Sequence, residues 1–300
     1  GRVFFDTLII DEALAPIATA DAGLLVQNMQ APVVITDLTV NSELGTALRL
    51  DNVGDPFTGF ANGQFRVTQG GDINAVDGAA IIATDSIIAM NFDSVSSDNS
   101  PTNGIFLFNN QRGTGTFALS VDPTPNTTGG SIVDALDEGI LLHNTGPILL
   151  NFMVVDGSGL DGILAENIEQ LVTSRAVGST DVVRVGTPDD VVFTPSLEID
   201  NATVVDNIAL GLFLADESRA GLRTIDIPQI SLNQGLYEDN GGLLEFPEIS
   251  LRTTRELITN EGTSSELELD YQISIVDVEV NEIGIDANAL EILAVNPQGT

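Results

Sequence analysis

The chain has 300 residues, of which 43% are hydrophobic and 5% are aromatic, and it contains neither tryptophan nor cysteine. Its 44 acidic residues against 10 arginines give a formal net charge of −34, which makes nucleic acid and anionic membranes poor partners. The composition excludes thiol chemistry and disulfides, and its hydrophobic content is too high for a disordered acidic tail. The charge either serves solubility alone or suits high-salt or calcium-rich surroundings, where cations screen the self-repulsion.

Short alternating runs of valine, isoleucine and leucine predict strands along most of the chain. In chain order, strands are expected at 3–11, 33–40, 65–68, 181–185, 191–193, 197–200, 202–205 and 290–295. Segment 265–280 alternates apolar and acidic residues and predicts a half-buried strand pair. Polar segments at 51–63, 94–103 and 123–130 predict protruding loops. Segments 160–172 and 283–293 have helical spacing but also fit the repeat described next, which is the preferred interpretation.

One short motif recurs: a glycine, then alternating apolar residues, then an asparagine five positions after the glycine. Its clearest copies, GILLHN at 139–144 and GILAEN at 162–167, lie 23 residues apart. The motif glycines are Gly23, Gly104, Gly139, Gly162, Gly211 and Gly235, with looser copies at Gly45, Gly78 and Gly284. The closing asparagines are Asn28, Asn109, Asn144, Asn167 and Asn240, with Asp216 closing the copy at Gly211. A unit of this size holds two short strands and cannot bury a core alone, so the motif predicts one rung of a stacked array.

With this rung length, motif and polar loops, the chain resembles the right-handed parallel β-helix, the pectate-lyase-like repeat of secreted and bacterial surface proteins. The resemblance implies an all-β solenoid of about 11–12 irregular rungs with protruding polar loops. It also implies that the closing asparagines stack into a ladder between rungs. The prediction is a single elongated domain over 1–300, less regular from about residue 173 onward. A β-sandwich array remains an alternative, because it also gives short alternating strands.

His143 is the only histidine, and it occupies a motif position where other copies have Gln27, Phe108, Glu166 or Ala215. A position that accepts such different residues is typical of an outward, solvated site. Catalysis by Ser-His-Asp or Cys-His groups therefore has no support in this sequence.

Paired carboxylates are the better candidates for an enzyme, because the resemblance includes pectin-degrading families that place acids on one face of neighbouring rungs. The candidate pairs are Asp189 with Asp190 and Asp156 with Asp161, and Arg175 and Arg184 lie near the acidic loops. The G-H-G and R-I-K motifs of the hydrolase branch are absent. With 44 acidic residues, some pairs arise by chance, so no catalytic residue is assigned.

A weak calcium site is the one metal site that the sequence suggests. Asp156, Ser158 and Asp161 lie in a glycine-rich turn, and hard oxygen ligands suit Ca²⁺. The turn lacks the spacing and the final glutamate of an EF-hand, so a plain turn is the alternative. Gly157, Gly159 and Gly162 also form G-x-G-x-x-G, but the repeat explains these glycines and no dinucleotide-binding unit surrounds them.

These features predict a structural, non-catalytic segment of an exported cell-surface or extracellular filament or adhesin protein. It would act as a rigid stalk and an assembly or adhesion surface that binds copies of itself or another surface protein. No cofactor is expected, and calcium is the one ion that the sequence leaves open. Both ends fall within strand patterns, which predicts a segment of a larger or processed protein. The alternative is a carbohydrate-active β-helix, which would be a polysaccharide lyase, a polysaccharide hydrolase or a spike-like glycan binder. The chain has only two tyrosines, Tyr237 and Tyr271, and no tryptophan, so aromatic stacking on sugars has weak support. Neither nucleic-acid binding nor membrane insertion is expected.

Overall fold

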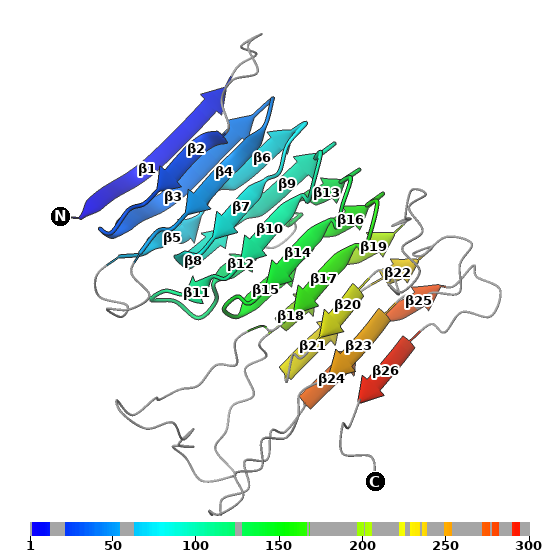
Figure 1. Ribbon diagram of the computed structural model, residues 1–300. Coiled ribbons are helices and arrows are strands. Elements are labelled where there is room, and N and C mark those ends of the chain that lie inside the picture. Colours follow the sequence, from blue (N-terminus) through cyan, green and yellow to red (C-terminus); the bar gives the residue numbers. More distant parts are fainter. Residues whose placement is uncertain are drawn as a thin grey trace, which may run out of the picture.

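The computed structural model of the chain is all-β, and its described residues form 26 strands and no helix (Figure 1). The described residues are 2–12, 22–54, 63–123, 128–166, 168, 197–200, 202–205, 222–225, 229–234, 236–238, 249–253, 272–276, 278–281 and 290–294. Within these ranges, no helix could span a membrane. The strands of each sheet lie side by side in a row, with β1 (Val3–Glu12) at one end of the molecule and β26 (Leu290–Ala294) at the other.

The smaller of two sheets has nine strands, and each pairs with the next in chain order. They are β2 (Ala22–Gln27), β4 (Thr46–Asp51), β7 (Ile81–Thr84), β10 (Ile105–Phe108), β14 (Ile140–His143), β17 (Ile163–Glu166), β20 (Leu222–Ile225), β23 (Ile249–Thr253) and β26. Their first residues lie 23 to 59 positions apart. Neighbours in this sheet are therefore always one full repeat apart in the sequence.

The larger sheet has 17 strands, which follow two parallel series. One series contains β5 (Phe65–Gly70), β8 (Ile87–Phe92), β11 (Gln111–Arg112), β12 (Leu119–Val121), β15 (Ile148–Asn151), β18 (Leu197–Asp200), β21 (Gln229–Asn233) and β24 (Gln272–Val276). The other contains β6 (Asp72–Val76), β9 (Ser94–Asp98), β13 (Ser131–Val133), β16 (Val154–Asp156), β19 (Thr203–Val205), β22 (Leu236–Glu238) and β25 (Glu279–Asn281). The ten-residue strands β1 and β3 (Val33–Ser42) span both series. Every pairing among these strands is parallel.

One repeat holds three strands, whereas the motif predicted two. The apolar run at 147–155 is divided between β15 and β16, because Phe152 lies between them with φ at 55° and the side chain 42% exposed. A left-handed residue in the middle of an extended run turns the chain and starts a new strand. The hydrophobic pattern alone does not reveal such a corner.

The described residues contain nine strands in the smaller sheet, fewer than the expected 11–12 rungs. In the structure, Leu236–Glu238, which follows one motif glycine, is β22 of the larger sheet, so this copy does not mark a strand of the smaller one. Similar short apolar patterns therefore occur both in strands of the smaller sheet and in strands of the larger sheet.

One predicted loop is wrong: within 94–103, Ser94–Asp98 is β9 of the larger sheet. Val95 and Ser97 are both buried there, with exposures of 0% and 1%. The hydroxyl Oγ of Ser97 donates a hydrogen bond of 2.8 Å to the carbonyl oxygen of Gly78, which satisfies its polarity. A serine with a local acceptor can thus occupy an inward strand position.

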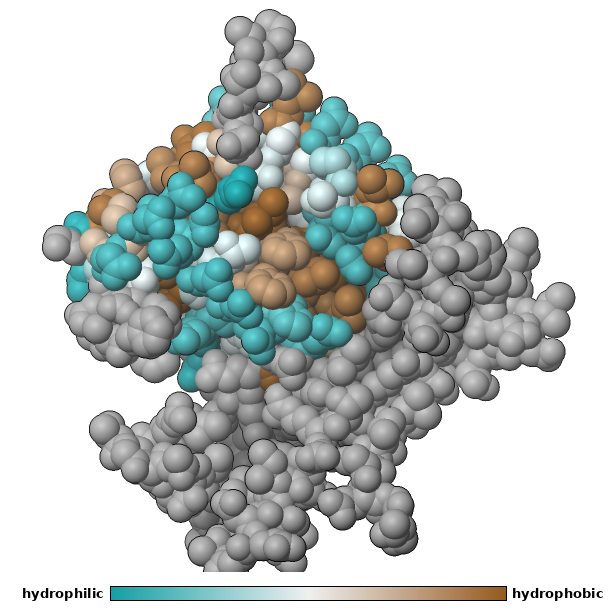
Figure 2. Space-filling model, in the orientation of Figure 1, coloured by the Kyte–Doolittle hydropathy of each residue, from teal (hydrophilic) through white to brown (hydrophobic). Residues whose placement is uncertain are grey.

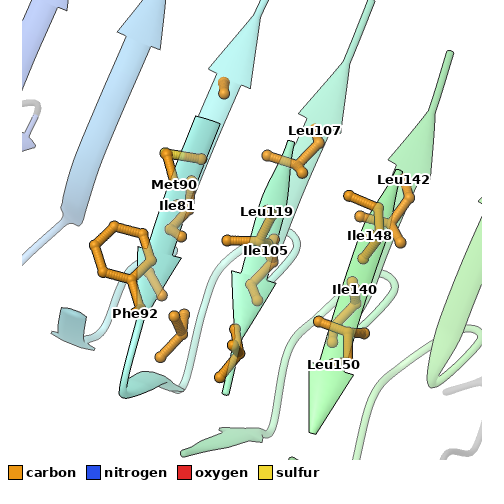
Figure 3. Close-up of a cluster of buried hydrophobic side chains, with 14 of the residues drawn as sticks. Ile81, Met90, Phe92, Ile105, Leu107, Leu119, Ile140, Leu142, Ile148 and Leu150 are labelled. Carbon is orange, nitrogen blue, oxygen red and sulfur yellow. The ribbon is translucent and has the colours of Figure 1, made fainter. Parts of the chain in front are cut away.

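The core is a single cluster of mainly aliphatic side chains, with Phe65 and Phe92 among the largest, and both sheets contribute to it. Figure 3 shows Ile105, Leu107 and Leu142 of the smaller sheet pointing toward Leu119 and Ile148 of the larger one. All five are fully buried. Since each inward position lies next to an inward position of the next repeat, the core continues along the row of strands.

Candidate functional surfaces

The outer face of the smaller sheet carries a continuous column of mixed side chains. The pairing register aligns Gln27, Asp51, Thr84, Phe108, His143 and Glu166 on consecutive strands. Gln27 Nε2 donates to Asp51 Oδ2 at 2.7 Å, and His143 Nδ1 lies 2.7 Å from Glu166 Oε2. Successive residues in this column therefore interact mainly with their neighbours along the row of strands.

His143 lies in this column with its side chain 30% exposed, on the outer face as the motif predicted. Its ring stacks on Phe108 with centroids 4.8 Å apart and planes 11° apart. Phe108 also stacks with Phe106 at 6.0 Å. One face of the Phe108 ring is thus occupied by His143, so that face is not available to an external ring.

Apolar residues gather on the same outer face, next to this column. Leu25, Ile82, Phe106, Leu141 and Leu164 alternate with inward residues on successive strands of the smaller sheet, while Arg49 interrupts the series. Figure 2 shows apolar residues in the middle of the visible face with hydrophilic residues around them. Phe106 and Phe108 thus lie on the outer face, whereas Phe65 and Phe92 are buried in the core.

An amide ladder lies where the strands of the smaller sheet end. Asn144 Nδ2 donates to Asn109 Oδ1 at 3.1 Å, and Asn109 Nδ2 donates to Asp85 Oδ1 at 3.2 Å. Asn52 Nδ2 donates to Asn28 Oδ1 at 2.8 Å. All five residues have positive φ, between 47° and 56°, and asparagine and aspartate accept this conformation better than other side chains do.

Asn52 and Asp85 are members of the ladder that sequence reasoning missed. In the clear copies the asparagine follows the glycine by five positions, whereas Asn52 and Asp85 follow Gly45 and Gly78 by seven. The two extra residues moved these positions out of the motif. A signal was present nonetheless, since each is a short polar residue two positions after the apolar run of a looser copy.

Four of the motif glycines lie at the start of strands in the smaller sheet. Gly23 is within β2, and Gly104, Gly139 and Gly162 directly precede β10, β14 and β17. A Cβ added to Gly139 would lie 2.5 Å from Ser158 Oγ and 2.7 Å from the carbonyl oxygen of Gly162. Glycine at this position therefore permits close approach of the next repeat.

The suggested calcium ligands lie in the turn between β16 and β17. Ser158 and Asp161 are buried, with exposures of 0% and 1%, and Asp156 is half-buried at the end of β16. Within the described ranges, no group of three or more acidic or histidine side chains is placed to hold a metal ion. The turn offers two carboxylates and one hydroxyl, and the groups of Ser158 and Asp161 are buried inside the fold. Calcium binding at this turn stays a prediction.

Two neighbouring pockets lie at the larger sheet, and sequence reasoning did not find them. They share Arg66, have volumes of about 450 and 250 Å³, and are together called the groove. The first is lined by Arg2, Phe4, Pro32, Val34, Gln64 and Thr114 in addition to Arg66, and the second includes Asn91, Phe117, Ser120 and Asp122. Gln64 accepts a hydrogen bond of 2.7 Å from the amide of Thr114 and donates one of 2.9 Å to its hydroxyl, which fixes the loop between β11 and β12.

The remaining sequence candidates lie outside the described residues. They are Asn167, Arg175, Arg184, Asp189, Asp190, Gly211, Asp216, Gly235, Asn240, Tyr271 and Gly284.

Comparisons with known proteins gave no match: no family model matches the chain, and no curated protein and no solved structure is significantly similar to it. The functional argument therefore depends on the arrangement of this chain alone.

Proposed function

We propose that the chain is a right-handed parallel β-helix that serves as a rigid, non-catalytic structural segment of an exported cell-surface or extracellular filament or adhesin protein. The observation that supports this most directly is the in-register pairing of nine parallel strands along the smaller sheet. Parallel strands joined by crossovers in one sheet are almost always right-handed. The proposal therefore assigns that hand to the coil.

Stacked strands make a stiff body because every repeat is held by backbone hydrogen bonds and by a continuous core. With a spacing of about 4.8 Å between strands, nine strands span roughly 40 Å. Asn109 and Asn144 add side-chain bonds between repeats at the strand ends. A body of this kind can hold other parts of a protein at a fixed distance, which is the role of a stalk.

The proposed location follows from the charge. A net charge of −34 gives strong self-repulsion unless cations screen it, and calcium-rich extracellular fluids supply such cations. Antibodies raised against the chain should therefore label intact, unpermeabilised cells of the source organism or a filament in the medium. Labelling only after permeabilisation would overturn the proposed location.

The second candidate is a carbohydrate-binding or carbohydrate-cleaving role, and the groove on the larger sheet favours it. This groove combines Arg66, Asn91 and Asp122 with the half-buried ring of Phe117, a mixture that suits sugar hydroxyls and a sugar face. A screen of polysaccharides for binding and cleavage separates the two roles. If a polysaccharide binds, Phe117→Ala should abolish the binding, and the control Phe106→Ala on the other sheet should leave it intact. That result would favour the carbohydrate role, whereas no binding to any polysaccharide would favour the structural role.

A further inference from the structure

Arg66 is a half-buried arginine on the outer face of the larger sheet that has no partner within the described part of the chain. Its guanidinium makes neither a hydrogen bond nor an ion pair with any residue there. Its neighbours along the row of strands are Val34 and Ala89, which carry no charge. Charges that leave water are normally paired, and the chain has 44 acidic residues that could pair with this one. The free guanidinium is therefore available to a ligand.

The segment 113–117, which joins β11 to β12, forms a wall over this part of the sheet and is called the wall segment. Gln64 is only 8% exposed and fixes this segment by two hydrogen bonds to Thr114, one of 2.7 Å from its amide and one of 2.9 Å to its hydroxyl. Arg112 Nη1 donates to a carbonyl oxygen within the segment at 3.0 Å. The segment covers the outward residue Ala89, whose exposure is 5%. Because the wall is already held in place, a ligand does not have to order it.

The pocket of about 250 Å³ beside the wall segment combines the Arg66 guanidinium with apolar and neutral polar groups. Its apolar part includes the ring of Phe117 and the side chain of Leu149, which are both half-buried. The amide of Asn91 and the hydroxyl of Ser120 are neutral polar groups in the same pocket. A positive group beside an apolar wall suits a ligand that is negatively charged at one end and apolar at the other.

The charges in this pocket favour a ligand with a single negative charge. Among its described lining residues, Arg66 is the only basic one and Asp122 the only acidic one, and the two form no ion pair. The carboxylate of Asp122 instead accepts a hydrogen bond of 3.0 Å from Asn151 Nδ2. A dianion such as phosphate would be repelled by Asp122 and by the net charge of −34. A carboxylate needs only one guanidinium, whose planar fork it matches with two parallel hydrogen bonds.

We propose that this pocket binds a small organic acid, whose single carboxylate pairs with the Arg66 guanidinium and whose apolar body lies against Phe117 and Leu149. A volume of about 250 Å³ is at the lower end for ligand pockets, so the ligand is small. The inference goes beyond the structural role and does not depend on it, because a rigid stalk has room for a ligand site on one face. It also differs from the carbohydrate candidate for the same groove, since the body of this ligand is apolar and carries no row of hydroxyls.

Ligand-observed NMR titrations of the complete chain with benzoate, benzamide and acetate test both parts of the ligand. Benzamide has the shape of benzoate without its charge, and acetate has the charge without the ring, so benzoate should bind most tightly. Arg66→Gln should weaken benzoate binding about ten- to hundredfold, because charge-assisted hydrogen bonds are lost. Arg49→Gln is the matched control and should leave the affinity unchanged, since Arg49 is also a half-buried, outward arginine but lies on β4 of the other sheet.

Two further variants test the apolar wall and the second charge of the pocket. Phe117→Ala should weaken benzoate binding and leave acetate binding unchanged, because only an apolar contact is lost. Asp122→Asn should strengthen benzoate binding roughly two- to fivefold, because a like charge is removed while an acceptor for Asn151 remains. A gain of affinity cannot come from misfolding, so this variant tests the pocket even if another variant is destabilised.

Three results would overturn the inference: a wild-type chain that does not bind benzoate, equal affinities for benzoate and benzamide, or an Arg66→Gln variant that binds benzoate as the wild type does. Tighter binding of glucuronate than of benzoate would also overturn it, because the ligand's body would then be polar, and would favour the carbohydrate candidate. A chain without this ligand can still be a rigid, elongated segment, so these failures leave the structural role intact.

Discussion

In β14, Leu141 and Leu142 are neighbours of the same residue type that face opposite sides of one sheet. Leu142 is fully buried in a column with Leu107 and Ala165, whereas Leu141 is only partly buried in a column with Phe106 and Leu164. The inner columns contain almost only aliphatic residues, while the outer ones range from glutamine to phenylalanine and glutamate. The inner face therefore determines how the repeats stack, whereas the outer face accepts any side chain that can contact its neighbours in the column.

The largest expected difference is between alanine substitutions at these two leucines. Leu142→Ala should lower the free energy of unfolding by about 2–5 kcal/mol, because it removes buried methyl groups and leaves a cavity. Leu141→Ala should lower it by about 1 kcal/mol or less, since the side chain is already partly in water. Urea unfolding of the two variants measures both values, and equal losses would contradict the division between inner and outer faces.

The next effect concerns the close approach of repeats at their corners. A Cβ on Gly78 would overlap the carbonyl carbon and oxygen of Gly45, which are backbone atoms that cannot move aside. Gly78→Ala should therefore lower the free energy of unfolding by about 1–3 kcal/mol. Gly115→Ala is the control, because its Cβ would lie 3.1 Å from the nearest atom, the side-chain Cβ of Ala89. In thermal unfolding, the melting temperature of this variant should be close to that of the wild type. Similar melting temperatures for the two variants would refute the close approach.

The ladder at the strand ends should have a smaller effect. Asn109→Ala removes two exposed side-chain hydrogen bonds, and it places alanine, which has no polar side chain, at a backbone φ of 56°. The free energy of unfolding should therefore fall by about 1–2 kcal/mol. Asn109→Gly removes the same bonds but accepts the backbone conformation, so its loss should be smaller. Chemical unfolding of both variants compares them, and a larger loss in the glycine variant would contradict this explanation.

The smallest effect is expected in the outer column. A double-mutant cycle with His143→Ala and Glu166→Ala should give a coupling free energy of about 1 kcal/mol or less, because the two side chains are 30% and 28% exposed. Unfolding measurements at low and high salt test both the size and the screening of this term. A coupling above about 2 kcal/mol would show that an outer column stabilises the stack as strongly as an inner one.

The parallel, strand-rich character of the fold and the positions of many strands could be predicted from the sequence. The alternation of apolar and polar residues predicted strands at 33–40 and 197–200, and these strands are β3 and β18 of the structure. Period-two alternation was informative there because each strand has one buried face. The same rule missed β9, because three of its five residues are serines, which hide the pattern, and the buried Ser97 makes a hydrogen bond to the backbone.

Corners between strands were harder to predict than strands. Phe152 divides β15 from β16 through its backbone conformation, and a phenylalanine gives no local signal for a turn. Asn28, Asn109 and Asn144 did give one, since asparagine accepts positive φ. The groove around Arg66 could not be predicted at all, because Arg2, Gln64 and Thr114 meet there only once the repeats are stacked.

The most direct test of the in-register stack is a set of distances along one outer column. Because the chain has no cysteine, spin labels can be attached to cysteines introduced at Gln27 together with Phe108, His143 or Glu166. These partners lie three, four and five strands away in the same column, so the distances should rise in even steps of about 4.8 Å. Distances measured by pulsed electron paramagnetic resonance that instead follow sequence separation, or show no regular step, would contradict the stacked arrangement.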